Sequence, residues 1–255
     1  MIGVILAAGE GSRLSRCVAE RYMKPLAIIN GVPLITYPVR SMLAAGVEEL
    51  LVVGNIYNHS PLGLAVRSAG ARRYSVVVNP DFGEACLSLR QALVRLAGRG
   101  FILSMSDHIY PPVLVEKLTR ECSGDICVAG DRRPRYVDVE EATKIEAEEG
   151  RALRFSKLLT SYSFIDMGVF YISPKASKTL LDYMDYPHAM SLSDLWNRVI
   201  VEGVLEVSVV DATDTPWMEV DDEEDYFQAV SGPGRELAWR VLYGSLEALS
   251  LDKSR

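Results

Sequence analysis

The sequence predicts an α/β fold: a single domain with a Rossmann-like mixed, mainly parallel sheet and helices on both faces. Short apolar runs typical of buried strands alternate with helical stretches along the first 125 residues, a pattern that favours parallel strands and right-handed crossovers. No linker, low-complexity tract or internal repeat divides the chain. Its 255 residues, of which 49% are hydrophobic, can bury one large core.

The first half of the chain reads as four strands, each followed by a helix. Glycines suited to helix C-termini end two of these helices, and prolines occupy the first turn of another. The predicted strands are 2–8, 49–55, 74–79 and 101–107. The predicted helices are 32–46, 60–70, 86–98 and 111–122. Ligands of such sheets bind beyond the carboxyl ends of the strands, so polar residues that follow strands are candidates for function.

After about Asp125 the regular alternation of predicted strands and helices ends. A hairpin is predicted at 143–157, with its turn at the Glu-Glu-Gly of residues 148–150. The other predicted strands are 125–131, 166–173 and 204–212, and the predicted helices are 174–184, 192–203 and 234–249. The last helix has an apolar stripe (Leu237, Val241, Leu242, Leu246, Leu249) that could pack on its own domain or form a homodimer.

Composition excludes some classes of function. A formal net charge of -7 argues against a partner nucleic acid bound through its phosphates. No secretory signal or bilayer-length apolar run is visible, which favours a cytoplasmic protein without a membrane span. The cysteines do not match a zinc-site spacing, so reduced, buried thiols are expected at Cys17, Cys86, Cys122 and Cys127. The scarcity of glutamine, at Gln91 and Gln228 alone, hints at a hot habitat.

The loop after the first strand, in the stretch LAAGEGSRL, has the composition of a phosphate site. Gly9 and Gly11 allow a ligand to approach the backbone, and Ser12 adds a hydroxyl donor. Arg13 and, eleven residues later, Lys24 supply two cations suited to a polyanion. The alternative is an ordinary turn with two cations in solvent. A dinucleotide-binding loop is disfavoured because no third glycine follows Gly11.

A carboxylate follows a later strand of the predicted sheet. Asp107 ends the buried run FILSMSD, where an acid is costly unless it is solvated, caps a helix or binds a metal. The sequence leaves open whether Asp107 is the N-cap of the helix at 111–122. His108 is left out of the catalytic set, because neighbouring side chains on a strand point to opposite faces.

LAAGEGSRL followed by KPL resembles the signature of nucleotidyltransferases that activate sugar or alcohol phosphates. The resemblance implies a GT-A-like nucleotidyltransferase fold, with a nucleotide-binding half at 1–125, an acceptor-binding half at 126–230 and a C-terminal helix at 231–255. It also implies that Mg²⁺ binds Asp107 and an acid after Trp217, here Asp221. Arg13, Lys24 and Lys157 would be catalytic. The nucleotide-binding residues would be Leu6, Ala7, Ala8, Gly9, Gly11, Ser12, Asn79, Gly83, Glu84 and Ser88.

On the acceptor side, Lys157 matches a family lysine that holds the acceptor phosphate, with Lys144 and Asp166 as further contacts. Three stretches, SMSDHIYPP, EATKI and DMGVFYISP, look most like the archaeal enzymes that join CTP to inositol 1-phosphate. The expected products are CDP-inositol and pyrophosphate, and the expected coupling is to a membrane alcohol phosphotransferase.

Three other functions stay open. They are a sugar 1-phosphate nucleotidyltransferase that uses UTP, dTTP or GTP, a phosphocholine cytidylyltransferase, and a catalytically inactive member that senses nucleotides. The stretch GEACLSL departs from the turn of the hexose enzymes near the base, which weakens the first of these.

Overall fold

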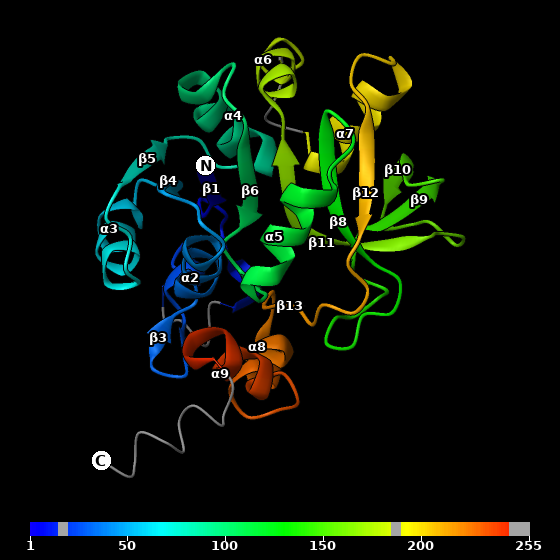
Figure 1. Cartoon of the computed structure of the whole chain (residues 1–255). Coiled ribbons are helices and arrows are strands. Elements are labelled where there is room, and N and C mark those ends of the chain that lie inside the picture. The colour runs from blue at the N-terminus through cyan, green and yellow to red at the C-terminus, as the bar shows by residue number, and fades with distance from the viewer. Residues whose placement is uncertain (15–19, 185–189, 245–255) are drawn as a thin grey trace.

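A single nine-stranded sheet runs through the computed structural model, which describes residues 1–14, 20–184 and 190–244. Its order is β5-β4-β1-β6-β11-β8-β12-β10-β9, from left to right in Figure 1. The strands are β1 (Ile2–Leu6), β4 (Glu49–Asn55), β5 (Tyr74–Asn79), β6 (Phe101–Met105), β8 (Ile126–Asp131), β9 (Lys144–Glu148), β10 (Arg151–Ser156), β11 (Phe164–Ile172) and β12 (Val207–Asp211).

The directions of the strands confirm a mixed, mainly parallel sheet. β1 is parallel to β4 and β6, β4 is parallel to β5, and β8 is parallel to β12. β11 lies antiparallel between β6 and β8, so the start of β11 meets the carboxyl end of β6. Residues from both halves of the chain therefore lie close together at the same end of the sheet's strands. The predicted hairpin is β9–β10, and Glu149 and Gly150 form its turn with positive φ.

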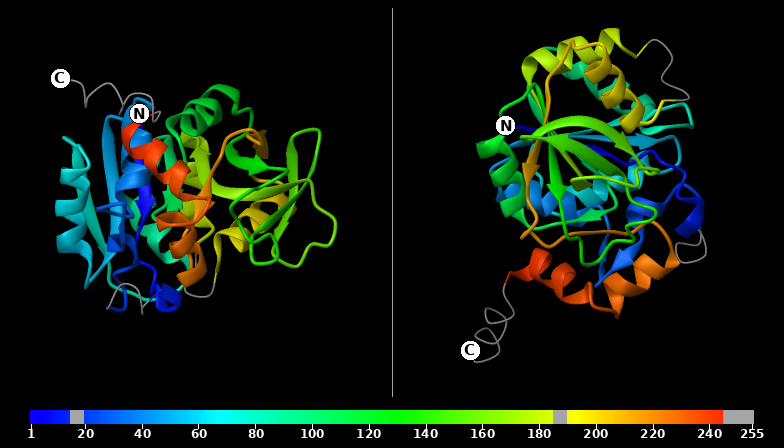
Figure 2. Two further views of the ribbon diagram at one scale, coloured as in Figure 1. Left: turned by 90° about the horizontal axis from the view of Figure 1, so that it is seen from below. Right: turned by 90° about the vertical axis from the view of Figure 1, so that its right-hand side faces the viewer.

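Helices cover both faces of the sheet, as predicted. One face packs against α2 (Thr36–Ala44), α3 (His59–Ser68) and α5 (Pro112–Glu121). The other packs against α4 (Ala85–Leu96), α6 (Pro174–Asp182) and α7 (Leu192–Val201). Every residue of β1 is buried, which explains its unbroken apolar sequence. Figure 2 shows α3 and the β9–β10 hairpin at opposite ends of the sheet.

A third apolar cluster lies beside the sheet. It joins α8 (Glu223–Val230) and α9 (Arg235–Tyr243) to the small pairs β2–β3 and β7–β13, and α8 and α9 lie together near β13 in Figure 1. The small strands are β2 (Ile28–Ile29), β3 (Val32–Pro33), β7 (His108–Ile109) and β13 (Met218–Glu219). α9 confirms the predicted C-terminal helix as far as Tyr243; Leu246 and Leu249 fall outside the described residues.

Two local predictions were wrong. The helix predicted from residue 32 begins at Thr36, because Val32–Pro33 pair with Ile28–Ile29 around Asn30 and Gly31. Both turn residues have positive φ, as a tight hairpin requires.

The prediction of four reduced thiols also fails. Cys122 and Cys127 form a disulfide, since the chain passes from the end of α5 into β8 with the two Cα atoms 5.6 Å apart. Cys86 is a buried thiol, as expected, and burial raises its pKa to about 12. Cys17 lies outside the described residues. Among the described helices, none has the length and apolar character needed to cross a membrane.

Candidate active site

Two acids distant in sequence are brought together by a short strand pair. Asp107 lies in the turn between β6 and β7, and Asp221 lies two residues beyond β13. β7 and β13 are antiparallel, with His108 opposite Glu219. The amide of Val220 donates to the carbonyl of Asp107 at 2.9 Å. This pairing places the carboxylates of Asp107 and Asp221 at the carboxyl end of β6.

Two cations from the first loop region meet these acids. The Nζ atom of Lys24 donates to Asp107 Oδ2 at 2.6 Å and to Asp221 Oδ1 at 2.6 Å. The guanidinium of Arg13 donates to the other oxygen of Asp221. The structure thus brings Arg13, Lys24, Asp107 and Asp221 to one centre, although their chemical roles stay predictions.

The charges at this centre stabilise one another. Burial alone would lower the pKa of Lys24, but the carboxylates of Asp107 and Asp221 outweigh it and raise that pKa above its ordinary value. Burial would raise the pKa of Asp107, but Lys24 and a hydrogen bond from His108 hold it well below its usual range. Two carboxylates that face one positive charge also suit a divalent cation whose other ligands are phosphate oxygens, so the donor set fits Mg²⁺.

Two cavities meet at the four-residue centre. The glycine-loop cavity, of about 240 Å³, is lined by Leu6, Gly9, Gly11, Ser12, Arg13, Lys24, Pro25, Met105, Ser106, Asp107 and Asp221. The β11 cavity, of about 350 Å³, includes Lys157, Asp166 and Glu219 in its lining. Arg13, Met105, Asp107 and Asp221 line both. A phosphate chain in one cavity and a second ligand in the other would meet at these shared residues.

The glycine loop is shaped by backbone freedom. Gly11 has a φ of +63°, and a Cβ built on it would lie 2.5 Å from Cβ of Lys24. A larger residue would therefore separate the loop from Lys24. Ala7 and Ala8 are buried behind the loop, and their carbonyls accept from the side-chain amides of Asn58 and Asn55. These alanines line neither cavity.

Most of the predicted base-reading residues lie apart from the two cavities. Asn79 and Ser88 are buried, and the amide of Asn79 donates to the Ser88 hydroxyl at 3.3 Å. Gly83 is exposed and lines neither cavity. Glu84 lines the β11 cavity and not the glycine-loop cavity. This hydrogen bond joins the end of β5 to α4, and the contact of Asn79 and Ser88 with the base stays a prediction.

On the acceptor side the structure separates the two predicted lysines. Lys157 and Asp166 line the β11 cavity. Lys144 does not: its buried ammonium donates to the carbonyl of Lys157 at 2.8 Å and to that of Glu140 at 3.3 Å. The structure therefore places Lys144 as a support for the backbone of Lys157. Burial raises the pKa of Asp166 to about 7, against the opposing effects of the Gly168 amide and His108.

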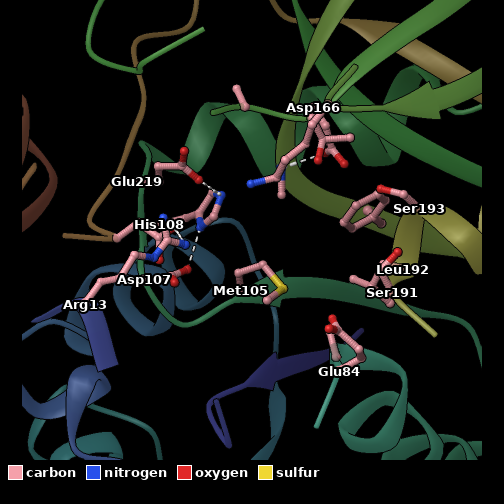
Figure 3. Close-up of a pocket in the computed structure, with 17 residues that line it drawn as sticks. Arg13, Glu84, Met105, Asp107, His108, Asp166, Ser191, Leu192, Ser193 and Glu219 are labelled. Atoms are coloured by element: carbon pink, nitrogen blue, oxygen red, sulfur yellow. Dashed lines mark hydrogen bonds and ion pairs between the residues drawn. The ribbon is translucent and has the colours of Figure 1, made fainter. Parts of the chain in front are cut away.

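Sequence reasoning missed two titratable residues of the β11 cavity, His108 and Glu219. Figure 3 shows Glu219, His108 and Asp107 along one side of this cavity, with Ser191, Ser193 and Glu84 across from them. His108 was excluded on the assumption of strand alternation. β6 ends at Met105 and the chain turns at residues 106–107, so alternation does not extend to His108. The N-cap interpretation of Asp107 is also wrong, because α5 begins after Pro111 and has no side-chain cap.

Comparison with known proteins places this geometry in a family. Residues 3–191 match the MobA-like NTP transferase domain. The chain belongs to the MobA-like NTP transferase family. A protein of Rubrobacter xylanophilus named bifunctional IPC transferase and DIPP synthase is 35% identical over 228 residues, which is 87% of this chain and 49% of that protein. The protein of the same name from Archaeoglobus fulgidus is 34% identical over 90% of this chain and 43% of its own length.

This NTP transferase domain spans about half the length of the curated relatives it matches. Solved structures agree with its fold. The inositol-1-phosphate CTP transferase from T. maritima superposes with a TM-score of 0.85 at 24% identity, over 96% of this chain and 97% of that one. A putative glucose-1-phosphate thymidylyltransferase from Bacillus anthracis gives 0.73 at 15% identity, over 90% and 94%. The predictions of fold and of a nucleotidyltransferase enzyme are confirmed.

Proposed function

We propose that this chain transfers the cytidylyl group of CTP to inositol 1-phosphate and releases pyrophosphate. The observation that carries the proposal is that two cavities share Arg13, Asp107 and Asp221 in their linings, and that Lys24 contacts both of these acids. The name of the matched structure from T. maritima, inositol-1-phosphate CTP transferase, supports CTP and inositol 1-phosphate as substrates, and the curated relatives are also named as transferases.

In this reaction an oxygen of the acceptor phosphate attacks the α-phosphorus of CTP. The bond from that phosphorus to the oxygen bridging to the β-phosphate breaks, and pyrophosphate leaves with the electron pair. The phosphate monoester is already anionic near neutral pH, so no side chain has to remove a proton. Catalysis then consists of alignment and of charge stabilisation in the transition state.

Each residue of the centre has a role in this proposal. The backbone of Gly9 and Gly11 lets the triphosphate approach closely. Arg13 and Lys24 stabilise the charge that develops on the departing pyrophosphate. Lys157 holds the acceptor phosphate in the β11 cavity. These three basic side chains come from separate segments, so substrate phosphates bind where the segments meet.

Asp107 and Asp221 are proposed to hold Mg²⁺. A divalent cation held by these two residues would supply neutralisation of the negative charge on the substrate phosphates. The two carboxylates contact the same ammonium group, so they already face a common cation position. Phosphate oxygens would complete the coordination shell, which Mg²⁺ sites with one or two carboxylates commonly require.

A screen for pyrophosphate release tests the substrates. CTP, UTP, dTTP and GTP are each offered with inositol 1-phosphate, phosphocholine and hexose 1-phosphates, with Mg²⁺ or with EDTA. The expected result is Mg²⁺-dependent release with CTP and inositol 1-phosphate. Release with a hexose 1-phosphate and UTP or dTTP instead would replace the proposed acceptor and nucleotide. Activity undiminished in EDTA would remove the metal from the proposal.

The curated relatives carry a second activity in their names, DIPP synthase, and are about twice as long as the matched region. We propose that the product of this domain, CDP-inositol, is consumed by a membrane alcohol phosphotransferase. Its diphosphate bond makes CDP-inositol an activated donor, which an alcohol can attack with loss of CMP. An assay that supplies the domain's product to that class of enzyme would test the coupling.

A further inference from the structure

The imidazole of His108 lies between two carboxylates. Its Nδ1 atom is 2.7 Å from Asp107 Oδ1, and its Nε2 atom is 3.8 Å from Glu219 Oε2. Strand pairing fixes this order, because β7 and β13 place His108 directly opposite Glu219. One ring therefore separates the acid at the charged centre from a second acid further along the cavity wall (Figure 3).

The His108 ring packs closely against two residues, Trp217 and Gly168. Trp217 stacks on it with ring centroids 5.8 Å apart, and the Trp217 indole donates to Asp131 Oδ2 at 2.9 Å. Gly168, with a φ of +65°, lies so close that a Cβ there would overlap the imidazole. The side chain of His108 is 8% exposed. These contacts leave it one orientation and keep its two nitrogens aimed at the two carboxylates.

Glu219 differs from Asp107 and Asp221 in the cavity that it lines and in its charged partner. Asp107 and Asp221 line both cavities and bond to Lys24, whereas Glu219 lines the β11 cavity only. The contact that the structure gives its carboxylate is His108 Nε2, at the long end of ion-pair range, and a quarter of its side chain is exposed. Its oxygens are therefore available to a ligand in the β11 cavity.

The rest of the β11 cavity is suited to a ligand with hydroxyl groups. Asp166 uses one oxygen to accept from the Gly168 amide, at 2.8 Å. Thr143 and Ser193 are hydroxyl-bearing residues of the lining, while Lys157 and Arg13 supply its positive charge. A phosphate bound near these cations would leave the remainder of its carrier molecule beside the carboxylates.

We propose that Glu219 is a specificity-determining residue that accepts hydrogen bonds from hydroxyl groups of the phosphorylated acceptor, and that His108 is the residue that positions it. This rests on the proposed transfer of a cytidylyl group to a polyol phosphate. A site that binds substrate hydroxyls discriminates strongly against analogues that lack them, because its polar groups are then left unpaired. Glu219 thus selects acceptors by their hydroxyls, whereas Asp107 and Asp221 act on any acceptor.

The test compares two acceptors with CTP: inositol 1-phosphate, and ethyl phosphate, which has the monoester but no hydroxyl. Glu219→Leu should lower kcat/KM for inositol 1-phosphate by about 30-fold or more and that for ethyl phosphate by less than about threefold. Glu219→Gln keeps one acceptor oxygen and should lie between the leucine variant and the native enzyme. Glu224→Leu, at an exposed position of α8 outside both cavities, is the matched control and should leave both values unchanged.

The role of His108 has its own readout. His108→Asn can still donate to Asp107 but cannot reach Glu219, so it should reduce the preference for inositol 1-phosphate while the Mg²⁺ concentration for half-maximal activity stays constant. Mn²⁺ binding in the presence of CTP, followed by electron paramagnetic resonance, should likewise be unchanged in both Glu219 variants.

Equal losses with both acceptors, or weakened Mn²⁺ binding in Glu219→Gln, would overturn the inference and make Glu219 part of the metal site. That result would leave the proposed function intact. If instead the native enzyme shows no preference for inositol 1-phosphate over ethyl phosphate, the proposed function fails, and the inference about Glu219 fails with it.

Discussion

The ammonium of Lys24 lies 2.6 Å from a carboxylate oxygen of Asp107 and 2.6 Å from one of Asp221. Its side chain is 10% exposed, so this cation is largely removed from solvent. The arrangement balances two acids that would otherwise repel each other at close range. Lys24 therefore links the stability of the centre to its chemistry, and the two contributions can be separated experimentally.

Lys24→Met should leave the two carboxylates without their shared counter-charge. We expect turnover to fall by about 10²–10³-fold, because a cation that stabilises transition-state charge is lost. In EDTA the free energy of unfolding of the variant should also be lower by about 3 kcal/mol. Adding Mg²⁺ should raise the stability of the variant by more than it raises that of the native protein. Thermal unfolding with and without Mg²⁺ measures this; equal melting temperatures of the variant and the native protein in EDTA would contradict it.

Arg13→Ala should affect chemistry and not folding. The Arg13 side chain is 53% exposed and contacts Asp221 at the rim of the centre. We expect kcat/KM to fall by about 10²-fold, since the residue is proposed to stabilise phosphate charge, with little change in melting temperature. Arg21→Ala is the matched control: Arg21 is 62% exposed, pairs with Glu10 and lines neither cavity. Similar losses in both variants would show that the effect belongs to the loop as a whole.

The neighbouring acids Asp221 and Asp222 should respond in opposite ways. Asp222 is the N-cap of α8 and accepts from the amides of Glu224 and Asp225, whereas Asp221 faces Lys24. Asp221→Asn should abolish most Mg²⁺-dependent turnover and cost little stability. Asp222→Asn should retain turnover, and Asp222→Ala should lose about 1 kcal/mol of unfolding free energy. Urea unfolding and a pyrophosphate assay on the three variants distinguish the roles, and an active Asp221→Asn enzyme would remove that residue from the metal site.

Local pattern was sufficient to predict much of the fold. β4 and β5 coincide with their predicted ranges, because both are short runs rich in branched residues and bounded by polar turns. The position of β11 could not be predicted in this way. Its apolar sequence favours a strand, but its insertion between β6 and β8 depends on pairing with residues far away in the chain. Local pattern carries no information about such a partner.

The residues of the candidate site also divide into those that local motifs predict and those whose placement depends on long-range pairing. Arg13, Lys24 and Asp107 follow from motifs close to strand ends, where ligands of parallel sheets bind. His108 and Glu219 were missed because their placement depends on the two-residue pair β7–β13, which is too short to show periodicity. Asn55 and Asn58 were missed for a related reason: they are buried polar residues whose amides hold the carbonyls of Ala8 and Ala7. Only the fold shows which backbone groups they satisfy.

The carboxyl group of Asp166 should make stability depend on pH. Burial raises its pKa in the folded protein to about 7, above an unfolded value near 3.8. A group with a raised folded pKa contributes its stability fully below the unfolded pKa and loses it as pH rises through the folded one. The loss should therefore extend from about pH 4 to pH 7. Asp166→Asn removes the titration, so the native protein should lose about 2 kcal/mol relative to this variant between pH 5 and pH 8.

Urea unfolding of both proteins at the two pH values, in EDTA and without substrates, measures this difference. Asp166→Asn keeps an oxygen that can accept from the Gly168 amide, so this hydrogen bond is retained in the comparison. Other titrating groups, including Glu219 and His108, are present in both proteins and largely cancel. Parallel stability profiles would mean that the Asp166 carboxylate is already ionised at pH 5 in the folded chain, and that solvent or a cation reaches it in the β11 cavity.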